Sequence, residues 1–321
     1  MLQELLKNNQ CFKLVCGAGN EDIKEIEKLV TIYSLAGCNF FDLCANSKVI
    51  KAAKRGLKNS QQEENKYLCI SVGIEGDPHI TKAKIEKDIC KNCNLCSKIC
   101  PREAIINNEV NQTRCIGCSQ CAKNCPANAI KMETKVQNYS EILPELIKEG
   151  ISCIEFHAIS ENENDVLNKW DEINSSFDGM LCISLDRSTS GDKKLIDLVK
   201  KMLKKRNPYT TIIQADGVAM SGNDDEYGTT LQAVATAQLF QNAKLDAYIM
   251  MSGGTNTKSI ELANLCKVYP NCIAVGSYAR KIVKEYLAMD DILENKEKLN
   301  EAVKIAKNLI DISLKNMKNI Q

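Results

Sequence analysis

Eight cysteines in the middle of the chain have the spacing of metal ligands. They lie in two copies of the pattern C-x2-C-x2-C-x3-C-P, and the second copy follows the first by 25 residues, from Cys90 to Cys115. Three thiolates at this spacing bind one [4Fe–4S] cluster, while the fourth, which precedes the proline, reaches the other cluster. We therefore expect two clusters, one with the ligands Cys90, Cys93, Cys96 and Cys125 and the other with Cys115, Cys118, Cys121 and Cys100.

The segment that holds these cysteines resembles the two-cluster module of bacterial ferredoxins over about 55 residues. In most proteins with this pattern the clusters carry electrons, although a cluster pair can also report redox state or stabilise a fold. Two structural zinc sites, each with four cysteine ligands, are the alternative, but zinc ligands usually come as separated C-x2-C pairs without a trailing proline. The ligands alone determine neither the potentials nor whether one cluster converts to a [3Fe–4S] form.

The rest of the chain alternates short apolar runs, rich in β-branched residues, with longer helical patterns, and it does so eight times. Strands separated by helices indicate βαβ units, and eight units are the number in a closed parallel (β/α)8 barrel of the TIM type. A doubly wound open sheet is the structural rival, but the short and regular spacing favours the barrel. The expected strands are 12–16, 39–44, 67–72, 152–156, 180–185, 210–214, 247–251 and 272–275, and the helical patterns include 22–36, 48–57, 141–148, 192–205, 229–241 and 258–267.

The cysteine segment interrupts this alternation between the third expected strand and the next helical pattern. Residues 79–136 are expected to form an inserted α+β ferredoxin-like module, and residues 1–78 and 137–321 the barrel. Loops that follow the strands of such a barrel lie on its C-terminal face, where barrel enzymes have their active sites. We therefore expect the module over the barrel mouth. The Lys-rich, amphipathic tail, 290–321, is expected to form a last helix or two on the outside.

Polar residues alternate by two at the ends of several expected strands, which places them on one face at the barrel mouth. General acid or base catalysis fits such residues, and His157 is a candidate because the pKa of histidine lies near neutrality. Capping of the following helices is the other interpretation. Arg187 could bind an anion there or be an ordinary surface residue. The candidate catalytic residues are His157, Glu155, Asp186 and Asp216, and Asp42, Cys44, Ser184 and Gln214 share the pattern.

Two glycine turns follow the seventh and eighth expected strands. The first contains Gly253 and Gly254 in the run SGGTN, and the second contains Gly276 and Ser277 in the run VGSYAR. Backbone amides freed by glycine beside a helix start can hold an anion, and barrels often hold a phosphate group after these two strands. The turns are therefore candidates for binding flavin mononucleotide (FMN) or a phosphorylated substrate. The alternative is that these glycines only close tight turns.

Basic and acidic residues nearly balance, 42 against 41, so charge gives no reason to expect nucleic acid or a membrane surface as the main partner. No run approaches the roughly 20 apolar residues of a membrane span, and residues 1–10 lack the apolar core and cleavage site of a signal peptide. The nine cysteines outside the module lie mostly in apolar runs. Cys16 and Cys44 lie at strand ends, where a reactive thiol is the alternative, but we expect them to be buried structural residues. Reduced thiols of this kind suit the cytoplasm, where we expect the protein.

Four further stretches, in order along the chain, are similar to the light-dependent period (LdpA) family of cyanobacteria. They read KLVCGAGNED, YSLAGCNFFDLCA, DGVAMSGNDD and MSGGTN. The resemblance implies an iron–sulfur protein that senses cellular redox state, through a quinone or a redox partner protein, and passes it to a regulatory protein of the circadian input. The chain is rich in Lys, Asn and Ile, with a single Trp, which suggests an AT-rich genome. In a host without a clock, the redox chemistry alone would carry over.

Three functions fit these observations. The first is a redox-responsive regulatory protein, in which the state of the clusters alters a surface that a partner reads. The second is a barrel oxidoreductase that binds flavin or a phosphorylated substrate and uses the clusters as an electron conduit. The third is a plain electron carrier, which would leave about 260 residues of barrel without a role.

Overall fold

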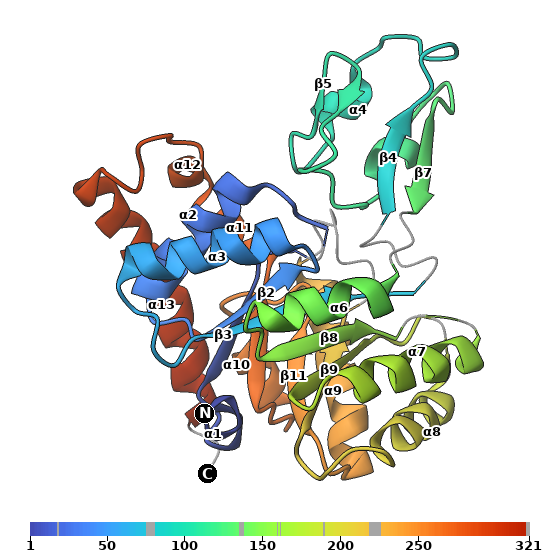
Figure 1. Cartoon of the computed structure of the whole chain (residues 1–321), viewed down its shortest axis with the longest axis vertical. Helices are drawn as coiled ribbons and strands as arrows, with labels where there is room; N and C mark the ends of the chain where they lie inside the picture. The colour runs from blue at the N-terminus through green and yellow to red at the C-terminus, as the bar shows by residue number, and fades with distance from the viewer. Residues whose placement is uncertain are drawn as a thin grey trace.

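Eight parallel strands close into a barrel in the computed structural model of the chain (Figure 1). Around the barrel they follow the order β1-β12-β11-β10-β9-β8-β3-β2. The predicted (β/α)8 barrel is therefore confirmed, and the open doubly wound sheet is excluded. The structure describes residues 1–17, 19–74, 81–134, 138–158, 160, 162–188, 190–217 and 226–318. The barrel strands are β1 (Cys11–Val15), β2 (Phe40–Cys44), β3 (Tyr67–Val72), β8 (Cys153–His157), β9 (Met180–Leu185), β10 (Thr211–Asp216), β11 (Tyr248–Ser252) and β12 (Cys272–Val275).

The helices that alternate with these strands pack their apolar sides against the outside of the barrel. The indole of Trp170, for example, is fully buried in this layer and donates its Nε1 hydrogen to the carbonyl oxygen of Met202 at 2.9 Å. The expected tail helix forms as α13, which lies against α2 and α10. The helices of the barrel are α1 (Leu2–Lys7), α2 (Ile23–Leu35), α3 (Ser47–Ser60), α6 (Tyr139–Lys148), α7 (Glu163–Ser176), α8 (Asp192–Leu203), α9 (Glu226–Ala243), α10 (Ser259–Leu265), α11 (Ser277–Lys281), α12 (Lys284–Leu287) and α13 (Lys296–Lys318).

The inside of the barrel is apolar at the end where the strands begin. Side chains alternate along each strand, so every second one points inward. The first inward-facing set packs with Leu2 and Leu6 of α1, which lies against the starts of the strands. The N-terminal helix α1 therefore closes the end of the barrel at which the strands begin, and we call this apolar layer the barrel floor. Five members of this layer are fully buried cysteines, namely Cys11, Cys69, Cys153, Cys182 and Cys272.

Between β3 and α6 the chain forms a small module that projects from one end of the barrel, at the upper right of Figure 1. Its two halves repeat each other. Glu86 donates its backbone N–H to the carbonyl oxygen of Ala129 at 2.8 Å, and Asn111, 25 residues later, donates to Ala104 at 2.7 Å. The expected module boundaries at His79 and Val136 lie outside the described residues. The elements of the module are β4 (Thr81–Ile85), α4 (Leu95–Lys98), β5 (Ile105–Ile106), β6 (Glu109–Val110), α5 (Gln120–Lys123) and β7 (Ile130–Thr134), with β4 antiparallel to β7 and β5 antiparallel to β6.

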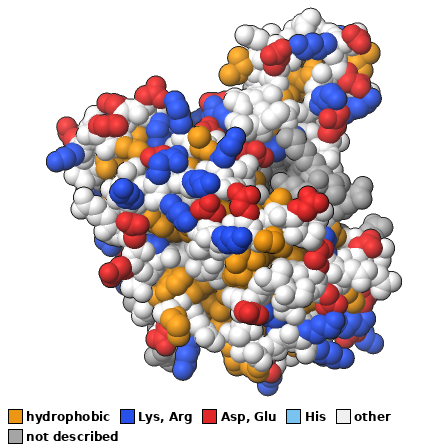
Figure 2. All heavy atoms as spheres, viewed as in Figure 1, with side chains coloured by type: hydrophobic (Ala, Val, Ile, Leu, Met, Phe, Trp, Pro, Cys, Tyr) orange, Lys and Arg blue, Asp and Glu red, His pale blue; other side chains and the backbone are white. Residues whose placement is uncertain are grey.

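The visible surface carries both signs of charge. Figure 2 shows basic and acidic side chains interspersed over this face, with basic ones gathered over α8. Lys205, just after the end of α8, pairs with Asp171 of α7 at 2.7 Å. Among the described residues, no helix is both long and apolar enough to cross a membrane.

Candidate functional site

The eight cysteines of the module line two cavities, with four in each. In both cavities three cysteines come from one copy of the repeat and the fourth comes from the other copy. We call one the near cavity, because Arg102 in its wall contacts the barrel, and the other the far cavity. Their ligation of iron stays a prediction. The near cavity is lined by Cys100, Cys115, Cys118 and Cys121, and the far cavity by Cys90, Cys93, Cys96 and Cys125.

Left-handed backbone lets the chain wrap around each cavity. In the first copy Asn92 and Asn94 have φ angles of 52° and 58°, and in the second copy Gly117 and Ser119 have φ angles of 71° and 58° at the equivalent positions. Asparagine and glycine adopt this conformation at lower cost than other residues. The residues between the cysteines are therefore suited to turn successive thiols toward one point.

Backbone amides already point at three of the cysteine sulfurs. Ala83 donates its N–H to Sγ of Cys115 at 3.4 Å. Ala104 donates to Cys100, and Ala129, at the equivalent position of the second copy, donates to Cys125, both at 3.3 Å. Hydrogen bonds to ligand sulfurs stabilise the thiolate charge of an iron–sulfur site and tune its potential. All 17 cysteines are unpaired thiols, so the donor set fits two iron–sulfur clusters.

A buried lysine of the module joins it to the barrel. The Nζ atom of Lys82 donates to the carbonyl oxygen of Gly19, in the loop after β1, and to that of Cys115, both at 2.6 Å. The same ammonium lies 3.6 Å from the carboxylate of Glu21. The Lys82 ammonium therefore connects the loop after β1 with the backbone of Cys115, which lines the near cavity.

A second buried contact centres on the carboxylate of Glu25, near the start of α2. Its Oε1 atom accepts hydrogen bonds from Arg102 of the module at 2.8 Å, from Arg280 of α11 at 3.1 Å and from Asn20 at 3.0 Å. Arg280 also donates to the carbonyl oxygen of Cys16, just after β1, at 2.7 Å. Although burial alone would raise it, the two guanidinium charges hold the pKa of Glu25 below its usual range.

Inside the barrel, above the apolar floor, a lysine is buried among acidic side chains. Lys13 of β1 is fully buried, and its ammonium forms an ion pair with Oε2 of Glu155. It also lies 3.6 Å from Oδ1 of Asp42 and donates to Oε1 of Gln214 at 3.3 Å. The ring of Phe40 lies beneath it, with 5.3 Å between Nζ and the ring centre. A buried charge needs such partners, because desolvation without them is very costly.

A hydrogen-bonded chain continues from this ion pair toward the ends of the strands. Oε1 of Glu155 contacts Nε2 of His157 at 3.1 Å and accepts from Nε2 of Gln214 at 2.8 Å. Gln214 also lies within 3.3 Å of Asp216, which accepts a hydrogen bond from the hydroxyl of Ser184. Three of the four candidate catalytic residues, His157, Glu155 and Asp216, are therefore brought together and buried.

The acidic groups of this cluster differ in their proton affinities. Burial raises the pKa of Asp42 and that of Asp216 to about 6 each, and the charge of Glu155 adds to both shifts. For Glu155 burial acts in the same direction, but the Lys13 ammonium outweighs it and holds the pKa well below its usual range. The carboxylates in turn keep the pKa of Lys13 well above its usual value, against the effect of burial. The cluster can therefore bind and release protons near neutral pH.

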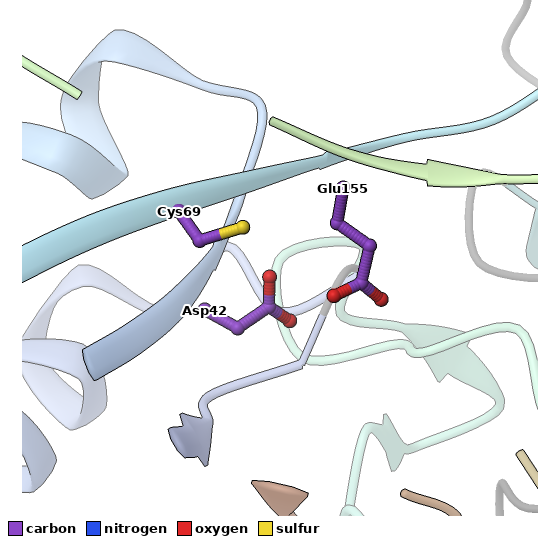
Figure 3. A group of neighbouring side chains, drawn as sticks. All are labelled: Asp42, Cys69 and Glu155. Carbon is purple, nitrogen blue, oxygen red and sulfur yellow. The ribbon is translucent and has the colours of Figure 1, made fainter. Parts of the chain in front are cut away.

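Three side chains of this cluster also have the geometry of a metal site. Figure 3 shows Asp42, Cys69 and Glu155 pointing toward one another from three neighbouring strands, and their ligand atoms lie within 4.8 Å of each other. The ammonium of Lys13, however, already contacts both carboxylates. A divalent cation there would meet a fixed positive charge, so Lys13 is the cation that balances this group.

Comparison with known proteins assigns the chain to a family. Residues 81–136 match the model of the LdpA Fe-S cluster-binding domain, and residues 145–312 match that of the light dependent period A C-terminal domain. A curated relative, light dependent period A of Synechococcus elongatus, is 30% identical over 298 residues, which cover 88% of this chain and 84% of the relative. The chain belongs to the light dependent period A family. The LdpA resemblance expected from the sequence is confirmed, and the module of this LdpA family member is an iron–sulfur-binding domain.

Solved structures similar to this LdpA family member are barrel enzymes of low sequence identity. Tryptophan synthase subunit alpha of Legionella pneumophila has 10% identity and a TM-score of 0.48, and the alignment covers 99% of this chain and 97% of that one. Dihydrodipicolinate synthase of Oceanobacillus iheyensis has 9% identity and a TM-score of 0.45, with 95% and 80% covered. Similarity this low says nothing about activity.

Two polar residues after β9 do not join the buried cluster. Asp186, the fourth candidate catalytic residue, accepts hydrogen bonds from the backbone and side chain of Ser188 and so forms a local turn. Arg187 is exposed and pairs with Asp192 at the start of α8, at 2.8 Å. For these residues the structure favours the local and surface interpretations. Asp186 lies beyond the last residue of β9, where the inward alternation of the strand ends.

The first glycine turn packs against the start of α9, and the second leads into α11. At Gly254 φ is +66°, and a Cβ atom there would lie 2.5 Å from Cβ of Thr229, so only glycine fits. The carbonyl oxygen of Gly254 accepts a hydrogen bond from Thr230. Ser277 is exposed, next to Gly276, at the start of the five-residue helix α11. Gly253 is buried, also with a left-handed φ, of 85°.

The sequence reasoning missed two charged residues that organise these sites. Lys13 lies inside the first predicted strand, which is expected to be buried. A buried charge needs a partner of opposite charge, so the lysine in this apolar run could have indicated a buried ion pair. Arg102 follows the first cysteine repeat, and the equivalent position of the second repeat is Ala127. That difference between two otherwise similar copies was visible in the sequence, but its partner, Glu25, was not. Cys16 and Cys44, in contrast, are buried as expected.

Proposed function

We propose that this protein is a redox-responsive iron–sulfur protein that holds two [4Fe–4S] clusters, one in the near cavity and one in the far cavity. The observation that supports this proposal is the grouping of eight thiols into two sets of four, each set completed by a cysteine of the other repeat. Bound there, each cluster supplies reversible one-electron chemistry. The chain's own contribution is to exclude water on one side, to donate N–H groups to the sulfurs and to connect the near cavity with the barrel.

The two cavities differ in exposure, and this difference supports separate roles. Cys93 of the far cavity is exposed, whereas Cys115 and Cys121 of the near cavity are buried. We propose that a redox partner protein or a quinone exchanges electrons at the far cavity, and that a regulatory protein reads the barrel, in the reducing cytoplasm. The timing role that the family name describes would require a host with a clock.

Metal content tests the two-cluster proposal. After anaerobic purification we expect about eight iron atoms per chain and no stoichiometric zinc. Cys93→Ser and Cys118→Ser should each reduce this to about four, because each removes a ligand of a different cavity, while Cys266→Ser, outside the module, should leave eight. Zinc at two per chain, or iron unchanged in both module variants, would refute the proposal.

The regulatory role is tested by partner capture. The wild type and the Cys93→Ser/Cys118→Ser double variant are used as baits under reducing conditions and after oxidation by a quinone. A partner whose capture by the wild type changes with oxidation, and whose capture by the double variant does not, supports redox sensing. Capture that is insensitive to oxidation would count against it.

The buried polar cluster of the barrel favours a second candidate, an oxidoreductase that binds flavin or a phosphorylated substrate at the barrel mouth. His157, Glu155 and Asp216 would then handle protons, with the glycine turns at Gly253, Gly254, Gly276 and Ser277 beside a phosphate group. Absorbance and cofactor extraction test this candidate. Two structured flavin bands and released FMN would support it, whereas broad cluster absorbance alone would refute its flavin form.

A further inference from the structure

The side chain of Arg102 belongs to two sites at once. It lines the near cavity, two residues after Cys100, and it also reaches the barrel, where its Nη2 atom donates to Glu25 at 2.8 Å. It is 6% exposed, so its charge is poorly screened by water. Its Nε–H group is buried and has no hydrogen-bond partner among the residues that the structure describes. Buried N–H groups normally have a hydrogen-bond acceptor. Because Arg102 is part of the wall of the near cavity, its Nε–H group is suited to an acceptor bound there.

The far cavity has no equivalent of this buried charge within the described part of the module. The position equivalent to Arg102 in the second repeat is Ala127, which lines the far cavity. The cation of the far cavity is Lys91, which is exposed and therefore screened by solvent. The two cavities thus have the same arrangement of thiols, but of the two described linings only that of the near cavity includes a buried cation. Lys82, which donates to the carbonyl oxygen of Cys115, is a second buried cation beside the near cavity.

We propose, as an extension of the function proposed above, that Arg102 and Glu25 couple the charge of the near cavity to the start of α2. One electron added in the near cavity by an external one-electron donor makes that site more negative by one unit. Arg102 is then attracted more strongly to the cavity, and its ion pair with Glu25 weakens. Glu25 keeps Arg280 as a partner, and Arg280 also holds the carbonyl oxygen of Cys16 at the end of β1. Arg102 is thus a positioning residue between the module and the barrel.

This coupling predicts potential shifts of opposite sign for two substitutions. Arg102→Gln removes a positive charge beside the near cavity and should lower the potential of that cluster. Glu25→Gln removes the negative charge that neutralises Arg102 and should raise the same potential. In both variants the potential of the far cluster should stay the same. A role of Arg102 in folding alone would not produce opposite shifts.

The experiment is a redox titration of the full-length, cluster-loaded protein, followed by electron paramagnetic resonance. The signals are assigned with Cys93→Ser, which removes the far cluster, and Cys118→Ser, which removes the near one. For Arg102→Gln we expect about a tenfold lower ratio of reduced to oxidised near cluster at fixed potential, which corresponds to about 59 mV. Arg102→Lys keeps the charge and should shift less. Lys87→Gln, which removes an exposed charge of the module paired with Glu109, is the matched control and should shift neither potential.

The barrel side of the coupling is tested by amide hydrogen exchange. Reduction of the wild type should change the protection of the amides from Asn20 to Ile26, and Glu25→Gln should abolish that change. The coupling is overturned if Arg102→Gln and Glu25→Gln move the near potential in the same direction or leave it unmoved, or if reduction leaves these amides unaffected. A wild type that lacks two [4Fe–4S] signals would instead overturn the proposed function.

Discussion

Replacing Lys13 with methionine tests whether the barrel interior depends on the buried ammonium of that residue. Methionine preserves most of the side-chain volume but removes the charge that Glu155 and Asp42 share. Two carboxylates would then be buried without their cation. The loss of one partner of a buried ion pair is strongly destabilising, because the remaining charge has neither water nor a counterion.

The expected cost can be worked from the geometry. At the 3.6 Å between Lys13 and Asp42, a pair of unit charges is worth about 5 kcal/mol at an effective dielectric constant of about 20. Measured losses on breaking buried pairs are about 3–5 kcal/mol. We therefore expect Lys13→Met to lower the free energy of unfolding by about 3–5 kcal/mol at pH 8. The deficit should shrink as the pH falls, because Asp42 and Glu155 then take up protons.

The assay is urea unfolding under anaerobic conditions, followed by circular dichroism and by the fluorescence of Trp170, which is fully buried. Combining Lys13→Met with Glu155→Gln should cost less than the sum of the single changes, by about 2 kcal/mol, since the double variant leaves fewer unpaired charges. Lys307→Met, which removes an exposed lysine paired with Asp311, is the control and should cost less than about 1 kcal/mol. Additive single effects below about 1 kcal/mol would refute the reasoning.

Two further predictions concern the barrel. The folded pKa of Asp216, about 6, exceeds the unfolded value of about 4, so the folded state is penalised above pH 6 and the penalty disappears as the pH falls toward 4. Asp216→Asn should therefore be roughly 3 kcal/mol more stable than the wild type at pH 8. About half of this advantage should remain at pH 5, and it should vanish below pH 4. Unfolding curves at the three pH values check this, and a constant difference would contradict it. Gly254→Ala should lower the free energy of unfolding by about 2 kcal/mol, because φ is +66° and the new Cβ atom would clash with Thr229. Gly191→Ala, where nothing lies within 4 Å, should change the unfolding midpoint little, and equal midpoints for the two alanine variants would be inconsistent with this account.

Much of the fold could be predicted because its signals are local in the sequence. The barrel strands were expected within a residue or two of their ends, as for β3 and β9, because a buried parallel strand is a short continuous apolar run. The inward alternation also indicated that His157, Glu155 and Asp216 share one face. The same alternation failed at Asp186, which lies past the end of β9 and bonds to Ser188. A period of two identifies a face only while the strand continues.

The sequence by itself was enough to predict the clustering of the eight cysteines, the repeat that contains them and the (β/α)8 order of the elements. Only the tertiary structure decided which charges meet. Lys13 and Glu155 are 142 residues apart, and Arg102 and Glu25 are 77 residues apart. Periodicity tells which side of a strand or helix a residue occupies, but not which distant residue lies opposite. Closure of the barrel brings β1 near β8, and docking of the module brings its repeat to α2, so the partners of the buried charges follow from packing alone.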